Sequence, residues 1–224
     1  MASAAMKNLA LKIRENGAPA SGTQPSVKAR RAEMEQTAAP VQGDVSAVEL
    51  TVGDMAAEWV TAPGADPARR LLYLHGGGLT LATILAARDR GLTLPNCAIT
   101  LSAWTDLAFT GESVSTRTEA DPMISVDSAN TLPAYVGDGD VKDSLVSPYY
   151  ADYAGLPPLL MQVGDAEVLL DDTTRVAEKA AAAGVEVTCE VEPEAFHVYQ
   201  MFAAFFPEGK EAVARIGSFL KKHQ

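Results

Sequence analysis

Short apolar runs, each followed by turn residues, recur along the chain from about residue 45 to its end. Runs rich in β-branched and other apolar residues predict strands, and turn signals such as Gly53-Asp54 separate them. The predicted strands lie at 45–52, 55–63, 69–78, 96–104, 157–165 and 185–193. Helical start and stop signals predict helices at 79–90, 171–184 and 207–224. Because strand and helix alternate, the pattern predicts an α/β fold with a mainly parallel sheet that is covered on both faces.

Two parts of the chain depart from this alternation. Residues 1–45 are polar and Ala-rich, with helical patches at 4–15 and 27–36, and we interpret them as an N-terminal arm or cap segment. The expected α/β domain then spans 46–224. Inside it, residues 105–155 are polar and contain Pro and Gly, which favours a partial helical cap, although an irregular loop region is an open alternative.

Charge narrows the range of partners. The 224 residues carry a formal net charge of -11, which disfavours nucleic acid and anionic membrane surfaces, because phosphate binding needs clustered Lys and Arg. No apolar run approaches the roughly 20 residues of a membrane span, and the N-terminus lacks the continuous apolar region of a secretory signal. We therefore expect a cytoplasmic protein that acts on a small molecule, with no membrane span.

The cysteines add no chemistry to this picture. Cys97 and Cys189 each lie in a strand-like apolar run, where free cysteine behaves as a small hydrophobe. Two such residues specify no metal site, and no motif indicates a cofactor.

A glycine turn gives the first candidate for chemistry. The stretch "LLYLHGGGLTLATILAARDRG" runs from a predicted strand through three glycines into a predicted helix. Such a turn can aim backbone N–H groups of Gly76 and Gly77, and of Gly78 as a third candidate, at an oxyanion. The alternative is a tight turn that only joins strand to helix. A nucleotide site is disfavoured, because "GGGLTL" fits neither G-x-G-x-x-G nor a P-loop.

A candidate acid and base follow the last two predicted strands. His197 lies in "EPEAFHVYQ", where a general base can sit at the carboxyl edge of a parallel sheet, or where a structural histidine can lie. Glu167 follows the preceding strand, with Asp165 as the alternative acid, and a carboxylate there can orient an imidazole. For Asp171 and Asp172 the role of helix cap and first-turn charge is sufficient.

Together these segments resemble the hormone-sensitive-lipase-like branch of the α/β-hydrolases, which are serine carboxylesterases. The matching segments are "LLYLHGGG", "GLTLPNCAITLSAWTDL", "ADPM", "GLPPLLMQVGDAEVLLDD" and "FHVYQMF". The resemblance implies an oxyanion hole at the HGGG turn, with His75 supporting the loop, and an acid before His197 in chain order. Alignment at a constant distance from His197 selects Glu167. The resemblance further implies short-chain acyl esters as substrates and a homodimer formed through 185–192 and 208–222.

The nucleophile of such an esterase is missing. The G-x-S-x-G elbow occurs nowhere in the chain, and neither "GESVS" at 111–115 nor "SFLK" at 218–221 replaces it. In the resembled family the HGGG turn and the elbow are separated by helices and strands, and a helix like "GLTLATILAARD" comes only after the elbow. We interpret the chain as internally deleted at Gly78, which both motifs share. The strand at 69–78 is then expected to pair with the strand at 96–104, with helix 79–90 as a right-handed crossover. The resemblance and the deletion together imply a doubly wound, mainly parallel sheet of the α/β-hydrolase type, shortened to about six strands.

Three functions follow from this interpretation. The first is a short-chain ester hydrolase that is impaired or inactive because its serine is absent. The second is a catalytically dead homologue that binds an acyl or carboxylate ligand or a protein partner, and the third is a deletion product without a function of its own. An activated hydroxyl, with Ser102 in "LSAWTD" as one candidate, would favour the first; we expect His223, in a basic tail, to be solvated.

Overall fold

In the described part of the chain, three parallel strands form one sheet. In the computed structural model, β3 (Ala98–Leu101), β4 (Leu159–Gly164) and β5 (Val187–Glu192) lie in the order β3-β4-β5, with Ala98 opposite Leu159 and Leu159 opposite Val187. Every residue of β4 is buried, as expected for the middle strand of a parallel sheet that is covered on both faces. The structure describes residues 1–16, 44–52, 55–66, 71–72, 74, 76–124 and 136–224.

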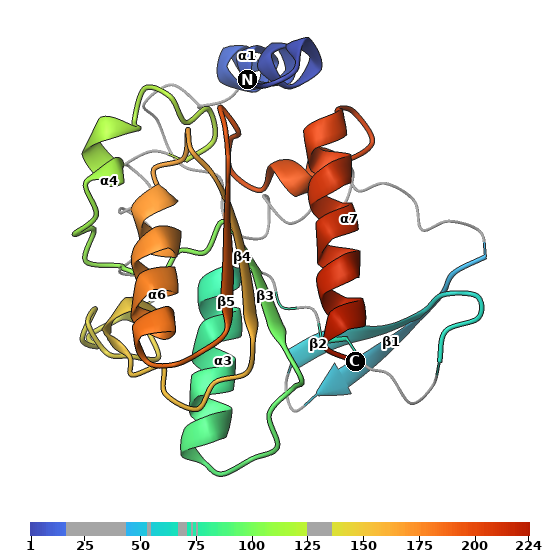
Figure 1. Ribbon diagram of the computed structural model, residues 1–224, viewed down its shortest axis with the longest axis vertical. Coiled ribbons are helices and arrows are strands. Elements are labelled where there is room, and N and C mark those ends of the chain that lie inside the picture. The colour runs from blue at the N-terminus through green and yellow to red at the C-terminus, as the bar shows by residue number, and fades with distance from the viewer. Residues whose placement is uncertain (17–43, 53–54, 67–70, 73, 75, 125–135) are drawn as a thin grey trace. The chain divides into compact units, whose positions relative to one another are not determined.

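Helices cover both faces of this sheet (Figure 1). Helices α3 (Gly77–Asp89) and α6 (Leu170–Ala182) pack on one face, where the core joins Leu81 and Val176 to Leu159 and Met161 of β4. Helix α7 (Pro207–Lys222) packs on the other face, where the Gln162 amide donates a hydrogen bond to the Ala212 carbonyl at 3.2 Å. The alternation of Met161 and Gln162 between the faces follows from the period of two in a strand. The α/β class is therefore confirmed.

The N-terminal helix belongs to this larger unit, which comprises residues 1–18 and 74–224. Helix α1 (Ala4–Asn16) buries Met6 in a second core cluster with Phe196, Tyr199 and Phe206. The helical patch predicted at 4–15 is confirmed, whereas the patch predicted at 27–36 lies outside the described residues. The boundary expected at residue 45 stays a prediction.

Short helices interrupt the segment that we interpreted as a cap. Its described residues contain α4 (Ser113–Thr116), the 3-10 helix η2 (Pro148–Tyr150) and turns. A further 3-10 helix, η3 (Tyr199–Phe202), follows the loop that carries His197.

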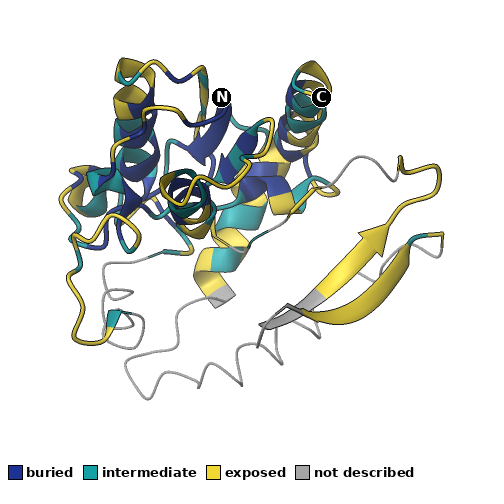
Figure 2. Cartoon of the chain, turned by 90° about the horizontal axis from the view of Figure 1, so that it is seen from below, coloured by how far each residue is buried: buried dark blue, intermediate teal, exposed yellow. Residues whose placement is uncertain are grey.

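The smaller unit, residues 19–73, contains a β-hairpin. Strands β1 (Ser46–Val52) and β2 (Met55–Thr61) pair antiparallel, with Ser46 opposite Thr61. Both predicted strands exist, but Trp59 and Val60 are half-exposed, and the described ends of the hairpin are coloured as exposed in Figure 2.

One predicted strand is wrong in its described part. Residues 71, 72 and 74 form no strand, and Leu71 and Leu72 are each 74% exposed. Within the described residues β3 pairs with β4 alone, and this sheet has three strands where about six were expected. The run at 69–78 has the composition of a strand, but cross-strand partners rather than composition stabilise a strand.

Candidate active site

The carboxyl edge of the sheet brings the predicted acid and base together. Glu167 lies in the turn after β4 and His197 lies in the loop after β5, and parallel strands end at the same edge. The Glu167 Oε2 atom lies 3.1 Å from the His197 Nδ1 atom. The Glu167 side chain is fully buried, whereas the His197 side chain is 20% exposed. This geometry suits a carboxylate that accepts a hydrogen bond from Nδ1–H and leaves Nε2 free to take a proton.

The second oxygen of Glu167 is held by two donors. Its Oε1 atom accepts hydrogen bonds from the Gly164 backbone N–H at 2.6 Å and from the Ser102 hydroxyl at 2.7 Å. The Ser102 Oγ atom in turn accepts the Val198 N–H at 2.9 Å, so one hydroxyl links the end of β3 to the acid and to the histidine loop. Ser102 and Val198 have positive φ values of 48° and 47°, in a backbone region that is unfavourable for residues other than glycine. These contacts fix the carboxylate with Oε2 toward His197.

A glycine allows the acid and base loops to approach each other. A Cβ atom on Gly164 would lie 2.1 Å from the Ala195 carbonyl oxygen, so no other residue fits at the end of β4. The Ala166 N–H donates a hydrogen bond to the same carbonyl at 3.1 Å. Backbone contact therefore joins the turn of Glu167 to the loop of His197.

Asp165, the alternative acid, has a different contact. Its Oδ1 atom accepts the Glu194 backbone N–H at 2.6 Å, in the loop that precedes His197. The structure places Glu167, and not Asp165, against the imidazole.

The three glycines lie at the start of α3. Gly76 has φ 100° and precedes the helix, and Gly77 and Gly78 form its first positions. A Cβ atom on Gly77 would lie 2.6 Å from the Ala103 Cβ, and one on Gly78 would lie 2.1 Å from the Trp104 carbonyl oxygen. These two glycines thus allow the helix to pack against the segment that follows β3. Their role as oxyanion donors stays a prediction, and His75 lies outside the described residues.

The serines that the sequence singled out are engaged elsewhere. Ser102 is buried and bonds to Glu167, and the Ser113 hydroxyl donates to the Val168 carbonyl at 2.7 Å. The Ser218 hydroxyl bonds to the Ala214 carbonyl within α7. Among the described residues, the hydrogen-bond partner of His197 is Glu167. None of these serines is placed as a nucleophile.

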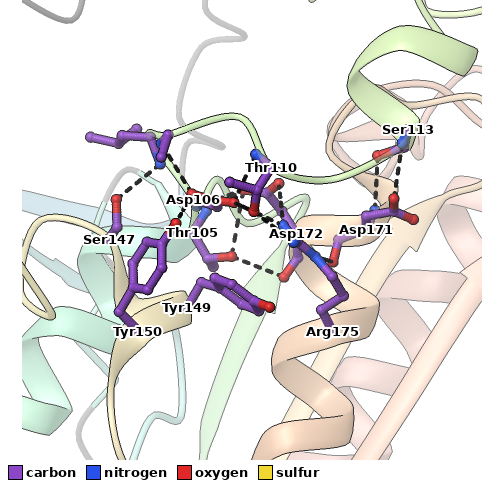
Figure 3. A network of polar contacts seen from close by, with 12 residues as sticks. Thr105, Asp106, Thr110, Ser113, Ser147, Tyr149, Tyr150, Asp171, Asp172 and Arg175 are labelled. Carbon is purple, nitrogen blue, oxygen red and sulfur yellow. Dashed lines mark hydrogen bonds and ion pairs between the residues drawn. The ribbon is translucent and has the colours of Figure 1, made fainter. Parts of the chain in front are cut away.

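A polar network holds the segment after β3 onto α6 (Figure 3). The Asp172 Oδ2 atom accepts the N–H groups of Thr105 and Asp106 at 2.7 and 2.8 Å, and Arg175 contacts the Asp106 Oδ2 atom at 3.0 Å. Burial raises the pKa of Asp172 to about 7, despite the two backbone donors. Asp171 likewise accepts the Ser113 N–H. The first-turn acids thus bind a neighbouring loop and do not cap their own helix, whose N-cap is Leu169.

His223 is also placed differently from the expectation. Its side chain is only 10% exposed, and its ring centroid lies 4.5 Å from that of Phe219, one helical turn earlier. The expectation of a solvated residue is wrong, because residues four apart on a helix lie on the same face.

Sequence and structure comparisons give the context for this geometry. The family model for the alpha/beta hydrolase fold matches residues 34–201. The chain belongs to this family. An acetyl-hydrolase of Streptomyces hygroscopicus is 40% identical over 147 residues, which are 65% of this chain and 49% of that protein. An esterase of Acinetobacter venetianus is 37% identical over 147 residues, 64% of this chain and 48% of that protein. The chain thus spans about half the length of these curated relatives.

Solved esterase structures share the architecture. The crystal structure of EstE5 soaked with ethyl alcohol has a TM-score of 0.93 at 31% identity, with 99% of each chain covered. An esterase from the bacterial hormone-sensitive lipase family has a TM-score of 0.89 at 30% identity, with 100% of this chain and 99% of that chain covered. These similarities confirm the α/β-hydrolase fold and the resemblance to the hormone-sensitive-lipase-like esterases.

Proposed function

We propose that the chain carries the acid and base of a serine carboxylesterase site for short-chain acyl esters, and that it is catalytically impaired because the nucleophile elbow is absent. Glu167 is the acid that orients the imidazole, and His197 is the general base. The N–H groups of Gly76, Gly77 and Gly78 are the oxyanion donors, with His75 supporting their loop.

One observation carries the acid–base assignment: the 3.1 Å contact between the buried Glu167 carboxylate and the more exposed His197 ring. The contacts of Gly164 and Ser102 leave only Oε2 for the histidine. A carboxylate held in this way favours one tautomer and stabilises the imidazolium that forms when the base takes a proton. The esterase names of the relatives agree with this use of the pair.

The proposed impairment follows from the chemistry of acyl transfer. A serine esterase needs an Oγ beside His Nε2 and beside the oxyanion donors, and no G-x-S-x-G motif supplies one in the 224 residues. When one member of a triad is removed, the rate that remains is about 10³–10⁴ above the reaction in water, supplied by the oxyanion hole and by substrate binding. We therefore expect only slow turnover of acetate and butyrate esters.

The hydrolysis of p-nitrophenyl acetate and butyrate tests this proposal. The wild type and the His197→Ala and Glu167→Gln variants are compared at equal concentration, after circular dichroism has shown that each is folded. We expect the same slow rate from all three, because no hydroxyl is available for His197 to activate. An initial burst of nitrophenol that disappears in His197→Ala would show a working nucleophile and overturn the impairment.

A second candidate is a dead homologue that binds a small acyl or carboxylate ligand or a protein partner. The observation that favours it is the first turn of α3, where the N–H groups of Gly77, Gly78 and Leu79 come before the first intrahelical donor, Thr80, and form the positive end of the helix dipole. Saturable ester binding without turnover favours this candidate. The third alternative, a deletion product without its own function, predicts neither binding nor turnover.

Partners and location belong to the proposal as well. We expect no nucleic-acid partner, and a homodimer formed through β5 and α7, where Val191 is 43% exposed on the last strand of the sheet. Sedimentation velocity of the wild type and of Val191→Lys tests the dimer, which the lysine should weaken.

No helix among the described residues is long and apolar enough to cross a membrane. A cytoplasmic location remains our expectation.

A further inference from the structure

A pocket of about 470 Å³ lies between α1 and the loops that follow α4, β4 and β5. Lys7 and Arg14 line it from α1, and Arg117 lines it from the turn after α4. Asp165 and Glu194 contribute the two carboxylates of its lining. The pocket is distinct from the contact between Glu167 and His197, neither of which lines it.

Both carboxylates of the pocket accept hydrogen bonds from within the protein. The Lys7 Nζ atom lies 3.1 Å from Glu194 Oε1, and Glu194 Oε2 accepts the Ala2 N–H at 2.6 Å. These donors hold the pKa of Glu194 below its ordinary value. Asp165 accepts the Glu194 backbone N–H through Oδ1. Lys7 is thus neutralised by Glu194, and Asp165 retains a formal charge.

The two guanidinium groups have no such partner. Arg14 Nη2 donates to the Ala120 carbonyl at 2.8 Å, a neutral acceptor. The Nε atom of Arg117 is buried and has no hydrogen-bond partner among the described residues. Both arginines meet the same turn, because the Ala120 N–H donates to the Arg117 carbonyl at 2.9 Å. Within the described part of the chain, neither guanidinium forms an ion pair.

The net charge of the pocket lining indicates the charge of the ligand that it can bind. Three cations and two carboxylates line the pocket, so one positive charge is left without a counterion in a chain whose net charge is -11. A guanidinium presents parallel N–H donors that match the two oxygens of a carboxylate. A buried polar donor without a partner is unfavourable, and an anion that accepts from it removes the penalty. A monoanion therefore fits the pocket better than a dianion.

The rest of the lining is apolar. Ala10 and Leu11 line the pocket from α1, Ala120 and Ala166 line it from the loops, and Leu11 is 53% exposed. Such side chains can cover a short aliphatic chain beside the guanidinium groups. We propose that this pocket binds a small aliphatic monocarboxylate, with Arg14 and Arg117 on the carboxylate and with Leu11 and Ala166 beside the alkyl chain. This site goes beyond the proposed esterase function and needs no nucleophile.

Titration of the full chain with sodium hexanoate, followed by ¹⁵N–¹H NMR, tests the site. We expect saturable shifts at Ala120 and Ala166. Hexanamide, which has the same shape without the charge, should bind at least about tenfold more weakly, because hydrogen bonds to charged groups are stronger than those to neutral ones.

Arginine variants locate the binding. Arg14→Gln and Arg117→Gln should each weaken hexanoate about tenfold, and Arg117→Lys should lie between wild type and Arg117→Gln because it keeps the charge but loses the planar fork. Lys210→Gln is the matched control, because it removes one positive charge from an exposed position on α7 outside the pocket. It should bind hexanoate as the wild type does.

Several results would overturn this proposal. They are the absence of saturable shifts, equal binding of hexanoate and hexanamide, unchanged affinity in both Gln variants, and tighter binding of inorganic phosphate than of hexanoate. Each is independent of ester hydrolysis, because His197→Ala should bind hexanoate normally. A failure of the esterase proposal therefore leaves this site intact, and the converse also holds.

Discussion

Replacing Ser102 by alanine tests whether this hydroxyl is a structural link. The Ser102 side chain is 3% exposed and makes two hydrogen bonds, one to the Glu167 carboxylate at 2.7 Å and one from the Val198 N–H at 2.9 Å. Alanine removes both and introduces no new polar group. The variant leaves one oxygen of a buried carboxylate with a single donor and leaves a partly buried N–H without an acceptor.

The expected loss follows from these contacts. A hydrogen bond to a charged group contributes about 1.5–3 kcal/mol, and an unsatisfied buried donor costs about 1–3 kcal/mol. Because the two effects share one hydroxyl and are not additive, we expect Ser102→Ala to lower the free energy of unfolding by about 2–4 kcal/mol. Ser102→Gly loses the same bonds but adopts φ 48° without strain, so it should be more stable than Ser102→Ala by about 1 kcal/mol.

Urea unfolding followed by circular dichroism measures both values. Ser218→Ala is the matched control, since that hydroxyl bonds only to its own helix on the exposed side of α7, and it should change the free energy of unfolding by less than about 0.5 kcal/mol. If Ser102→Ala is as stable as the control, or if Ser102→Gly is less stable than Ser102→Ala, then the structural role assigned to Ser102 is wrong.

Two further predictions concern the packing of α3 and the buried acid of α6. Gly78→Ala should lower the free energy of unfolding by about 2 kcal/mol or more, because its Cβ would lie 2.1 Å from the Trp104 carbonyl oxygen. Gly217→Ala, whose Cβ would meet no atom within 4 Å, should raise the free energy of unfolding by up to about 1 kcal/mol. Equal thermal unfolding of the two variants would contradict this prediction. Burial raises the pKa of Asp172 from 3.8 to about 7, so between these values the folded state keeps a proton that the unfolded state releases. The wild type should therefore lose stability relative to Asp172→Asn as the pH rises from 4 to 7. Urea midpoints measured across this range, with a constant difference between the two proteins, would refute that shift.

The sequence predicts the regular elements well where a strand or helix has an unambiguous pattern and a partner. The acidic residues in the first turn of α6 and the short, nearly continuous apolar run of β4 identify both elements. The Glu167–His197 pair is predictable for the same reason, because parallel strands place both residues at one edge and the family alignment selects the acid.

Other features depend on tertiary contacts that the sequence does not record. The run at 69–78 has strand composition, but its described residues have no cross-strand partner. Nothing in the sequence distinguishes the contacts of Ser102 from those of other serines, because its partner Glu167 lies 65 residues later and only the fold brings the two together. The sequence identifies Asp172 only as an acid in the first turn of a helix. Its contacts with Thr105 and Asp106 depend on how the segment after β3 packs against α6. The positive φ of Ser102 has no glycine or asparagine to signal it.

The central claim is that this chain keeps the acid and base of an esterase without an activated serine. The most direct test is the intact mass of the purified protein before and after exposure to a fluorophosphonate, which forms a stable adduct only with an activated serine. We predict the mass of 23.6 kDa with no adduct, in the wild type and in His197→Ala alike. An adduct in the wild type that His197→Ala abolishes would contradict the claim, because it would show a nucleophile that His197 activates.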